Sequence, residues 1–226
     1  MSNFERFVNS FFNPEVALRY LPRIAEGMLV TLGLGLAVIT TGIAAGLALA
    51  ILRALRVPFT AWIIVGFADI FRALPPLVII ILLFFAFPYI GMSMSAFTAT
   101  WLSLSLVLAA FAEEVFWAGI LSVHRGQWEA ASSLGLSPWG VLRHVILPQA
   151  VRLTVPPLTN RVIAITKGTA LGSVVALHEI VNVASSGSSE AGNPTPLTLG
   201  ALAYLILFIP VVWFGRRIEK RFAWKR

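Results

Sequence analysis

Residues 27–52, GMLVTLGLGLAVITTGIAAGLALAIL, contain no charged side chain. A helix needs about 20 apolar residues to cross the ~30 Å hydrocarbon core of a bilayer, so this stretch is long enough to span a membrane. Of the 226 residues in the whole chain, 58% are hydrophobic and 12% are charged, and the mean hydropathy is +0.86. Soluble domains carry roughly 25% charged residues, so this composition indicates an integral membrane protein.

Further apolar runs predict four more spans. No charged residue occurs between Ala73 and Ala112, a run too long for one helix, and Pro88 and Gly91 divide it in two. We expect the first of these two spans to break at residues 74–76, because each of the two prolines there lacks a backbone donor and clashes with the preceding turn. The sequence therefore predicts a single all-α membrane domain, residues 1–226, with five spans: residues 27–52, 59–87, 99–121, 157–177 and 197–215.

The distribution of basic residues predicts the orientation. The net charge is +7, and six of the 17 Lys and Arg residues lie in the last eleven positions, directly after an apolar run. Basic residues next to a span favour the cytoplasmic side, so this cluster indicates membrane orientation rather than nucleic-acid binding. Five spans place the N-terminus outside and the C-terminus inside. The cytoplasmic cations are then Arg53, Arg56, Arg125, Arg143, Arg152, Arg216, Arg217, Lys220, Arg221, Lys225 and Arg226.

The predicted cytoplasmic segment, residues 122–152, carries strong local signals for two short helices. Gly135 can close the first helix as a left-handed cap, and Ser137 followed by Pro138 can start the second. Apolar residues then recur at helical spacing, and we expect Pro148 to end the second helix. Such an element could lie flat on lipid or dock in a groove of a soluble partner. Docking is favoured, because the polar face has few basic residues and Glu129 is followed by two small alanines.

Two weaker features lie outside this segment. Gly42 and Gly46 form a pair at Gly-x-x-x-Gly spacing, which permits close helix contact. Residues 185–196 are rich in Ser, Gly and Pro and are interpreted as a solvated outer loop. The chain has no cysteine, which excludes disulfides and thiolate metal sites, and no metal site is predicted.

The cytoplasmic segment resembles the EAA loop of ATP-binding-cassette (ABC) importer permeases. Glu129-Ala130-Ala131 is followed after three residues by Gly135, after nine more by Val145, where the family usually has isoleucine, and then by Leu147-Pro148. Residues 27–32, 72–75, 109–114, 126–129, 147–150 and 167–171 are similar to the branch of that family that serves histidine, glutamate, glutamine, arginine and opines. The departures from that branch are Gly168 for aspartate, Trp117 for arginine, and Ala73-Leu74 for Gly-Thr.

The resemblance implies a type I importer permease fold in the bacterial inner membrane, moving polar amino acids into the cytoplasm. It implies three kinds of partner: a cytoplasmic ATPase dimer, a second permease copy or paralogue, and an extracytoplasmic binding protein. The chain contains no Gly-x-x-x-x-Gly-Lys-Ser/Thr phosphate loop, so we expect no ATPase site and no cofactor of its own, with ATP and Mg bound by the partner. The residues expected to couple to that ATPase are Glu129, Ala130, Ala131, Gly135, Val145, Leu147 and Pro148.

Ionisable residues within the spans are the candidates for the substrate pathway, since such residues are costly in a membrane unless paired or functional. The expected pathway residues are the charged Arg72, Glu114 and Lys167, together with Trp117, whose ring lies one helical turn from Glu114 and can also hold a cation. The alternative is that these charges, with Glu113 and Arg161, pair with one another and only hold helices together. A self-contained channel or secondary transporter would also explain them, but not the cytoplasmic element. A membrane enzyme is weaker still, because the adjacent Glu113 and Glu114 point about 100° apart on a helix.

Overall fold

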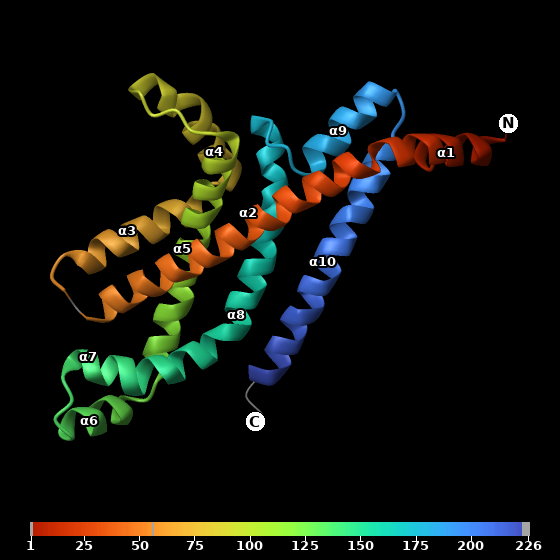
Figure 1. The fold of residues 1–226 in the computed structure, drawn as a ribbon. Coiled ribbons are helices and arrows are strands. Elements are labelled where there is room, and N and C mark those ends of the chain that lie inside the picture. Colours follow the sequence, from red (N-terminus) through yellow and green to blue (C-terminus); the bar gives the residue numbers. More distant parts are fainter. Residues whose placement is uncertain (1, 56, 223–226) are drawn as a thin grey trace. The chain divides into compact units, whose positions relative to one another are not determined.

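The structure is a computed structural model that describes residues 2–55 and 57–222, and within these residues it is helical and contains no strand (Figure 1). Arg56, Lys225 and Arg226, three of the predicted cytoplasmic cations, lie outside the described residues. In chain order the elements are α1 (Asn3–Phe11), α2 (Pro14–Ala54), α3 (Thr60–Ala73), α4 (Pro76–Ile81), η1 (Leu82–Ala86), η2 (Phe87–Ile90), α5 (Ala96–Ser122), α6 (Arg125–Ser133), α7 (Pro138–Val141), η3 (Leu142–Ile146), α8 (Leu147–Lys167), η4 (Gly168–Val175), α9 (Ile180–Ala191) and α10 (Thr195–Phe222).

Three stretches are long and apolar enough to cross a membrane within the part of the chain that the structure describes: α1 with α2, α5, and α10. A fourth is reached if α3 and the segment Pro76–Ile90, which meet at 100°, count as one broken span. The break lies at Leu74, whose extended backbone is the conformation favoured before a proline, so the predicted interruption is confirmed. The apolar content of α8 falls short of this level, and the count of five spans stays a prediction.

The described residues fall into two compact units. The first unit takes residues 2–37, 77–103 and 167–213, and the second takes residues 38–55, 57–76, 104–166 and 214–222. Each unit has its own buried cluster: Ile24, Ile180, Val183, Ala184 and Ala203 in the first, and Phe116, Ile120, Leu142, Ile146 and Leu158 among others in the second.

Close helix contacts in the second unit depend on small residues. A Cβ atom at Gly42 would come within 2.8 Å of Leu108, and one at Gly46 within 2.5 Å of Ala112. Both distances are too short for real atoms, so glycine is required for α2 to approach α5. The predicted Gly-x-x-x-Gly pair therefore serves contact within the chain.

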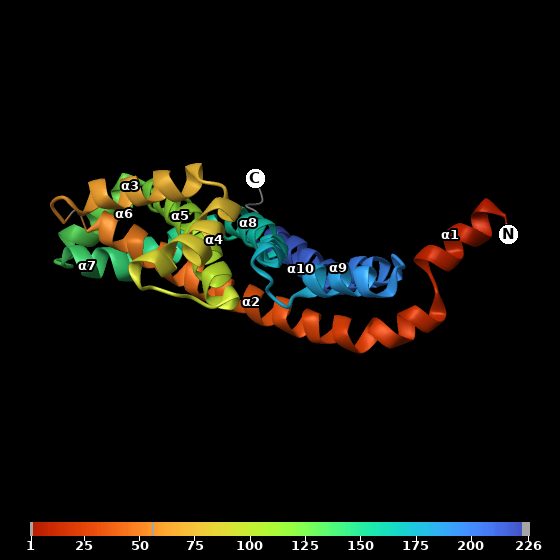
Figure 2. The same ribbon diagram turned by 90° about the horizontal axis from the view of Figure 1, so that it is seen from above.

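Residues 185–196 are not the solvated loop that the sequence indicated. Most of them belong to α9, which lies beside the start of α10 (Figures 1 and 2). Apolar and small residues of α9 recur at positions 180, 183, 184 and 187, and all four are buried. Gly187 lets Tyr20 of α2 pack closely, since a Cβ atom there would lie 2.8 Å from the tyrosine ring. Within the predicted loop, Gly187 belongs to the packing face of a helix, and most of the serines lie on the exposed side of the same helix.

Pro148 does not end a helix, contrary to the expectation from sequence. Helical structure runs without a break from α7 through η3 into α8. In η3 the Leu147 N–H bonds to the Leu142 carbonyl, five residues back, so the helix widens there into a π turn. A wider turn relieves the clash between a proline ring and the carbonyl four residues earlier, and the helix continues past Pro148.

Candidate functional site

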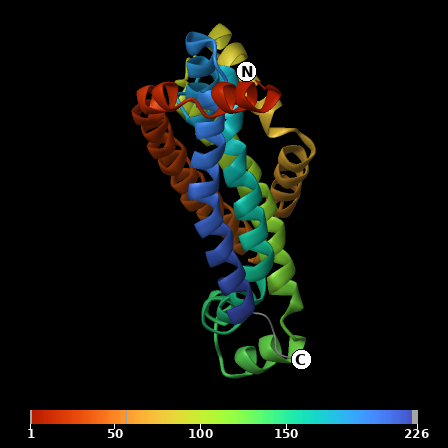
Figure 3. The ribbon, with the colours of Figure 1, turned by 90° about the vertical axis from the view of Figure 1, so that its right-hand side faces the viewer.

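The pair α6 and α7 has the local geometry that its sequence predicts. Helix α6 ends at Ser133, and Gly135 takes φ +80°, a conformation that favours glycine. The Ser137 hydroxyl accepts a hydrogen bond of 3.2 Å from the Gly140 N–H and so caps α7, with Pro138 in its first turn. Two short helices are thus joined by a sharp turn. Figure 3 shows that this pair of helices extends beyond the end of α5.

The seven predicted coupling residues divide between two environments. Ala131 is buried, and Val145 and Leu147 are partly buried against the core of the second unit. Glu129, Ala130, Gly135 and Pro148 are exposed. The first group fixes the element to the rest of the unit, and the second group is accessible to a partner.

Three further residues at the turn were missed. Leu134 is 83% exposed, Leu136 is 39% exposed and Trp139 is 44% exposed, although all three are large and apolar. We call these three residues the apolar tip. Exposed apolar side chains grouped on a rigid element indicate an interaction surface. The signal was present in the sequence, since large apolar residues flank a turn glycine where polar ones are usual.

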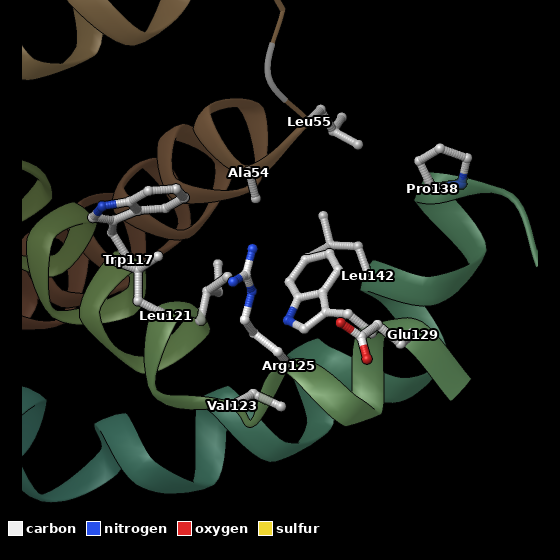
Figure 4. Close-up of a pocket in the computed structure, with 11 residues that line it drawn as sticks. Ala54, Leu55, Trp117, Leu121, Val123, Arg125, Glu129, Pro138 and Leu142 are labelled. Atoms are coloured by element: carbon white, nitrogen blue, oxygen red, sulfur yellow. The ribbon is translucent and has the colours of Figure 1, made fainter. Parts of the chain in front are cut away.

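We call α6, α7 and the turn that joins them the coupling element. A pocket of about 570 Å³ lies between the coupling element and the ends of α2 and α5 (Figure 4). Arg125 and Glu129 of α6 line it together with Trp117 of α5. Its other lining residues are Ala54, Leu55, Ile120, Leu121, Val123, Trp128, Pro138 and Leu142. The coupling element is therefore not fully packed against the helices that it adjoins.

Next to this pocket Arg53 of α2 joins two side chains of α5. Its guanidinium lies 3.0 Å from Oε1 of Glu113 and 4.5 Å from the centre of the Trp117 ring. Glu113 is fully buried, and its Oε2 atom has no hydrogen-bond partner among the described residues. Sequence reasoning placed Arg53 among the cytoplasmic cations, and its pairing with Glu113, 60 residues away, had no local signal.

A second ion pair forms between Arg72 of α3 and Glu114 of α5, at 2.9 Å. Arg72 also lies 3.9 Å from Asp69, one turn earlier on the same helix. The guanidinium of Arg161 lies 4.4 Å from the centre of the Phe111 ring. Glu113 and Glu114 thus face different arginines, as their helical spacing predicts.

Three of the four expected pathway residues lie in the second unit, and they take part in two separate contacts. Arg72 and Glu114 meet, whereas the indole of Trp117 stacks on Arg53. Lys167 is exposed and belongs to the other unit. In this conformation Arg72 and Glu114 pair with each other, which was the alternative left open by the sequence.

Comparisons with known proteins agree with this geometry. A family profile described as "Binding-protein-dependent transport system inner membrane component" matches residues 24–224. The probable amino-acid ABC transporter permease protein YckA of Bacillus subtilis (strain 168) is 35% identical over 213 residues, which cover 94% of both chains. The probable glutamine ABC transporter permease protein GlnP of the same organism is 34% identical over 207 residues, covering 89% of this chain and 94% of that protein.

Solved structures show the same fold. A chain from the crystal structure of an amino acid ABC transporter with histidines matches with a TM-score of 0.81 and 28% identity, covering 90% of this chain and 96% of that one. A chain of the MetNI methionine ABC transporter matches with a TM-score of 0.71 at 20% identity, over 90% of this chain and 98% of that one, a similarity of fold alone. The chain therefore belongs to the family of binding-protein-dependent transport system inner membrane components, the permease subunits of ABC transporters.

Proposed function

We propose that this chain is the permease subunit of an ABC importer that moves polar amino acids into the cytoplasm, driven by ATP hydrolysis in a separate subunit. The amino-acid permeases YckA and GlnP, similar over nearly their whole lengths, support this substrate class. The resemblance of residues 109–114 and 147–150 to the polar amino acid branch points to the same class.

The observation that carries the proposal is the apolar tip on the turn between α6 and α7. Apolar residues exposed on a capped turn fit the groove of a soluble protein. The polar face of the element is poor in Lys and Arg, which disfavours an anionic lipid surface as its partner. We infer that the partner is a cytoplasmic ATPase dimer, which binds ATP and Mg, while this subunit holds no nucleotide or cofactor.

The remaining parts of the assembly follow from the same proposal. A second permease, either another copy or a paralogue, completes the pathway, and an extracytoplasmic binding protein delivers the amino acid. The N-terminus lies outside and the C-terminus in the cytoplasm, since described basic residues of the last turns of α10 (Arg216, Arg217, Lys220 and Arg221) follow an apolar run.

The pocket beside α6 suggests how movement of the tip reaches the spans. Trp117 lines the pocket and also stacks on Arg53, which pairs with Glu113. A shift of α6 toward the pocket would displace the indole and with it the guanidinium. The proposed consequence is that docking of the ATPase changes how tightly α2 and α5 are held together by this ion pair.

The pair of Arg72 and Glu114 is the proposed contact for the amino acid itself. Both side chains are partly exposed, at 34% and 48%, so water or a solute can reach them. A zwitterionic amino acid offers a carboxylate for the guanidinium and an ammonium for the glutamate. Entry of the substrate would thus exchange one ion pair for two, with no charge left unpaired in the membrane.

The coupling proposal is tested by Gly135→Val in a complex reconstituted with its ATPase and binding protein. A β-branched residue at φ +80° strains the turn by ~1 kcal/mol or more and displaces the tip. We expect normal insertion into the membrane, loss of uptake, and ATP hydrolysis that no longer responds to the loaded binding protein. Leu134→Ser should reproduce this loss without backbone strain, whereas Ser132→Ala on the same helix should not. Normal uptake by both Gly135→Val and Leu134→Ser would refute docking through the tip.

A further inference from the structure

Helix α1 presents one apolar face that nothing in the first unit covers. Phe4, Phe7, Val8 and Phe11 recur at spacings of three and four residues and so share one side of the helix. No residue of α1 is buried: Phe4 is 74% exposed and Phe7 is 51% exposed. The rings of Phe7 and Phe11 lie 4.9 Å apart, so the face is a continuous aromatic surface.

Local interactions hold α1 as a helix. The Ser2 hydroxyl accepts a hydrogen bond of 3.1 Å from the Glu5 N–H, and the Glu5 carboxylate accepts one of 2.8 Å from the Ser2 N–H. This reciprocal capping satisfies two donors at the start of the helix. A helix of nine residues is nevertheless marginal in water, so its stability depends on what covers its apolar face.

Three hydrogen bonds fix the depth at which α1 lies. The Asn193 side chain donates to the Asn9 carbonyl (3.2 Å), the Thr195 hydroxyl donates to the Ser10 carbonyl (3.1 Å), and the Asn13 N–H donates to the Thr195 hydroxyl (3.1 Å). Thr195 is the first residue of α10, just before the charge-free run 197–215. The end of α1 is therefore held where an apolar span begins, which is the boundary between membrane and water.

From this junction α1 projects away from α9 and α10 (Figures 1 and 2). We propose that α1 lies in the membrane interface, with Phe4, Phe7, Val8 and Phe11 inserted among the lipids and its polar face toward water. Aromatic residues favour this depth, and an amphipathic helix held there buries its apolar face in lipid.

The charges of α1 indicate what kind of lipid surface it fits. Its two charged residues are Glu5 and Arg6, so the helix carries no net charge. Binding to the interface therefore depends on apolar area and not on attraction to anionic headgroups. Zwitterionic lipid should suffice, and salt should have little effect.

The proposal is tested with single cysteines, since the chain has none of its own. Phe7→Cys lies in the apolar face and Asn9→Cys lies opposite, and each is labelled with an environment-sensitive fluorophore. The labelled protein is reconstituted in phosphatidylcholine vesicles with or without doxyl-labelled phosphatidylcholine. We expect position 7 to be quenched by the doxyl lipid about three times more than position 9, equally at low and high salt. Phe4→Cys, which leaves the pair of Phe7 and Phe11 intact, should behave like Phe7→Cys.

Two results would overturn the proposal. Equal, water-like signals at positions 4, 7 and 9 would mean that the face stays in solvent. Signals at positions 4 and 7 that are shielded from water, resist the lipid quencher and weaken when the protein is diluted in lipid would mean that a second copy covers the face.

Discussion

Two glutamates, one in each unit, are fully buried but are satisfied in opposite ways. Glu179 accepts hydrogen bonds from the N–H groups of Val181 (2.9 Å) and Asn182 (2.7 Å) and from the hydroxyl of Tyr204 (2.9 Å). Glu113 instead pairs with one cation, Arg53, and its Oε2 atom accepts no hydrogen bond from the described residues.

Glu179 has several hydrogen-bond donors, whereas Glu113 depends on a single cation that another helix supplies. Glu179 caps the start of α9: two of the groups that donate to it are backbone N–H groups in the first turn of that helix, and the third, the Tyr204 hydroxyl, belongs to α10. Burial raises the pKa of the Glu179 carboxyl above its ordinary value, and the three donors oppose this rise. The partner of Glu113 lies at the end of α2 and also stacks on Trp117 at the pocket beside α6. We therefore expect Glu179 to matter for stability and Glu113 for both stability and coupling.

The largest effect is expected for Glu113→Ala, which leaves Arg53 without its carboxylate. Removing one partner of a buried ion pair costs roughly 3–5 kcal/mol, and we expect about 3 kcal/mol, because Arg53 is partly exposed and keeps its contact with Trp117. The measurement is chemical unfolding in detergent. Glu113→Gln, which keeps a hydrogen-bond acceptor, is the matched control and should lose less. Unchanged stability of Glu113→Ala would mean that the ion pair is too hydrated to hold α2 to α5.

Glu179→Ala should cost about 2 kcal/mol, since it removes a helix cap and the buried carboxylate that accepts the hydrogen bond of the Tyr204 hydroxyl. Unfolding of the variant in detergent measures this loss. Uptake per folded molecule distinguishes the two glutamates. We expect it to stay normal in Glu179→Ala and to fall in Glu113→Ala. Equal loss of uptake in both variants would remove the proposed distinction between them.

Glu114→Gln should lower uptake about tenfold, or about 1.4 kcal/mol, while assembly and ATP hydrolysis survive. The amide keeps the shape of the side chain but cannot pair with the substrate ammonium or with Arg72. Asp69→Asn is the matched control, because Asp69 is more exposed and lies 3.9 Å from the same arginine. If uptake by Glu114→Gln equals that of Asp69→Asn, the glutamate only holds helices together and the amino acid binds elsewhere.

Structural features that depend on a few adjacent residues could be predicted from the sequence, whereas features that depend on packing between distant segments could not. The turn at Gly135, the cap at Ser137 and the break at Leu74 each depend on a few adjacent residues, and the structure confirms all three. Helix α9 was missed because its serines and glycines favour loops when read singly. Its buried positions 180, 183, 184 and 187 follow a helical period, and their packing partners Ile24, Ala203 and Tyr20 lie in other helices.

The sequence could predict which charged residues lie within the spans, but not which of them form ion pairs with one another. An ionisable side chain within an apolar run is visible in the sequence, and Arg72 and Glu114 were identified this way. Which carboxylate meets which arginine depends on how α2 and α3 pack on α5. Arg53 was assigned to the cytoplasmic side because it ends a span, yet its long side chain reaches back to Glu113.

The smallest effect is expected at an exposed pair that holds a carboxylate on α9, Arg23 with Glu190 at 2.7 Å. The hydrogen bond from Arg23 lowers the pKa of the Glu190 carboxyl below its ordinary value, because it favours the ionised form. A lowered pKa in the folded state means that the pair stabilises the fold above the ordinary carboxyl pKa, and that this stabilisation disappears as the pH falls through the lowered value. Arg23→Gln should therefore lower the melting temperature slightly at neutral pH. In acid, the difference in melting temperature between variant and parent should shrink to the part that comes from the contact of Arg23 with the Tyr20 ring. Arg19→Gln, whose guanidinium also lies over that ring but makes no ion pair with Glu190 among the described residues, should show a smaller dependence on pH. A difference that grows toward acid would contradict the assignment, because it would require a Glu190 carboxyl that is protonated more readily in the folded protein than in the unfolded chain.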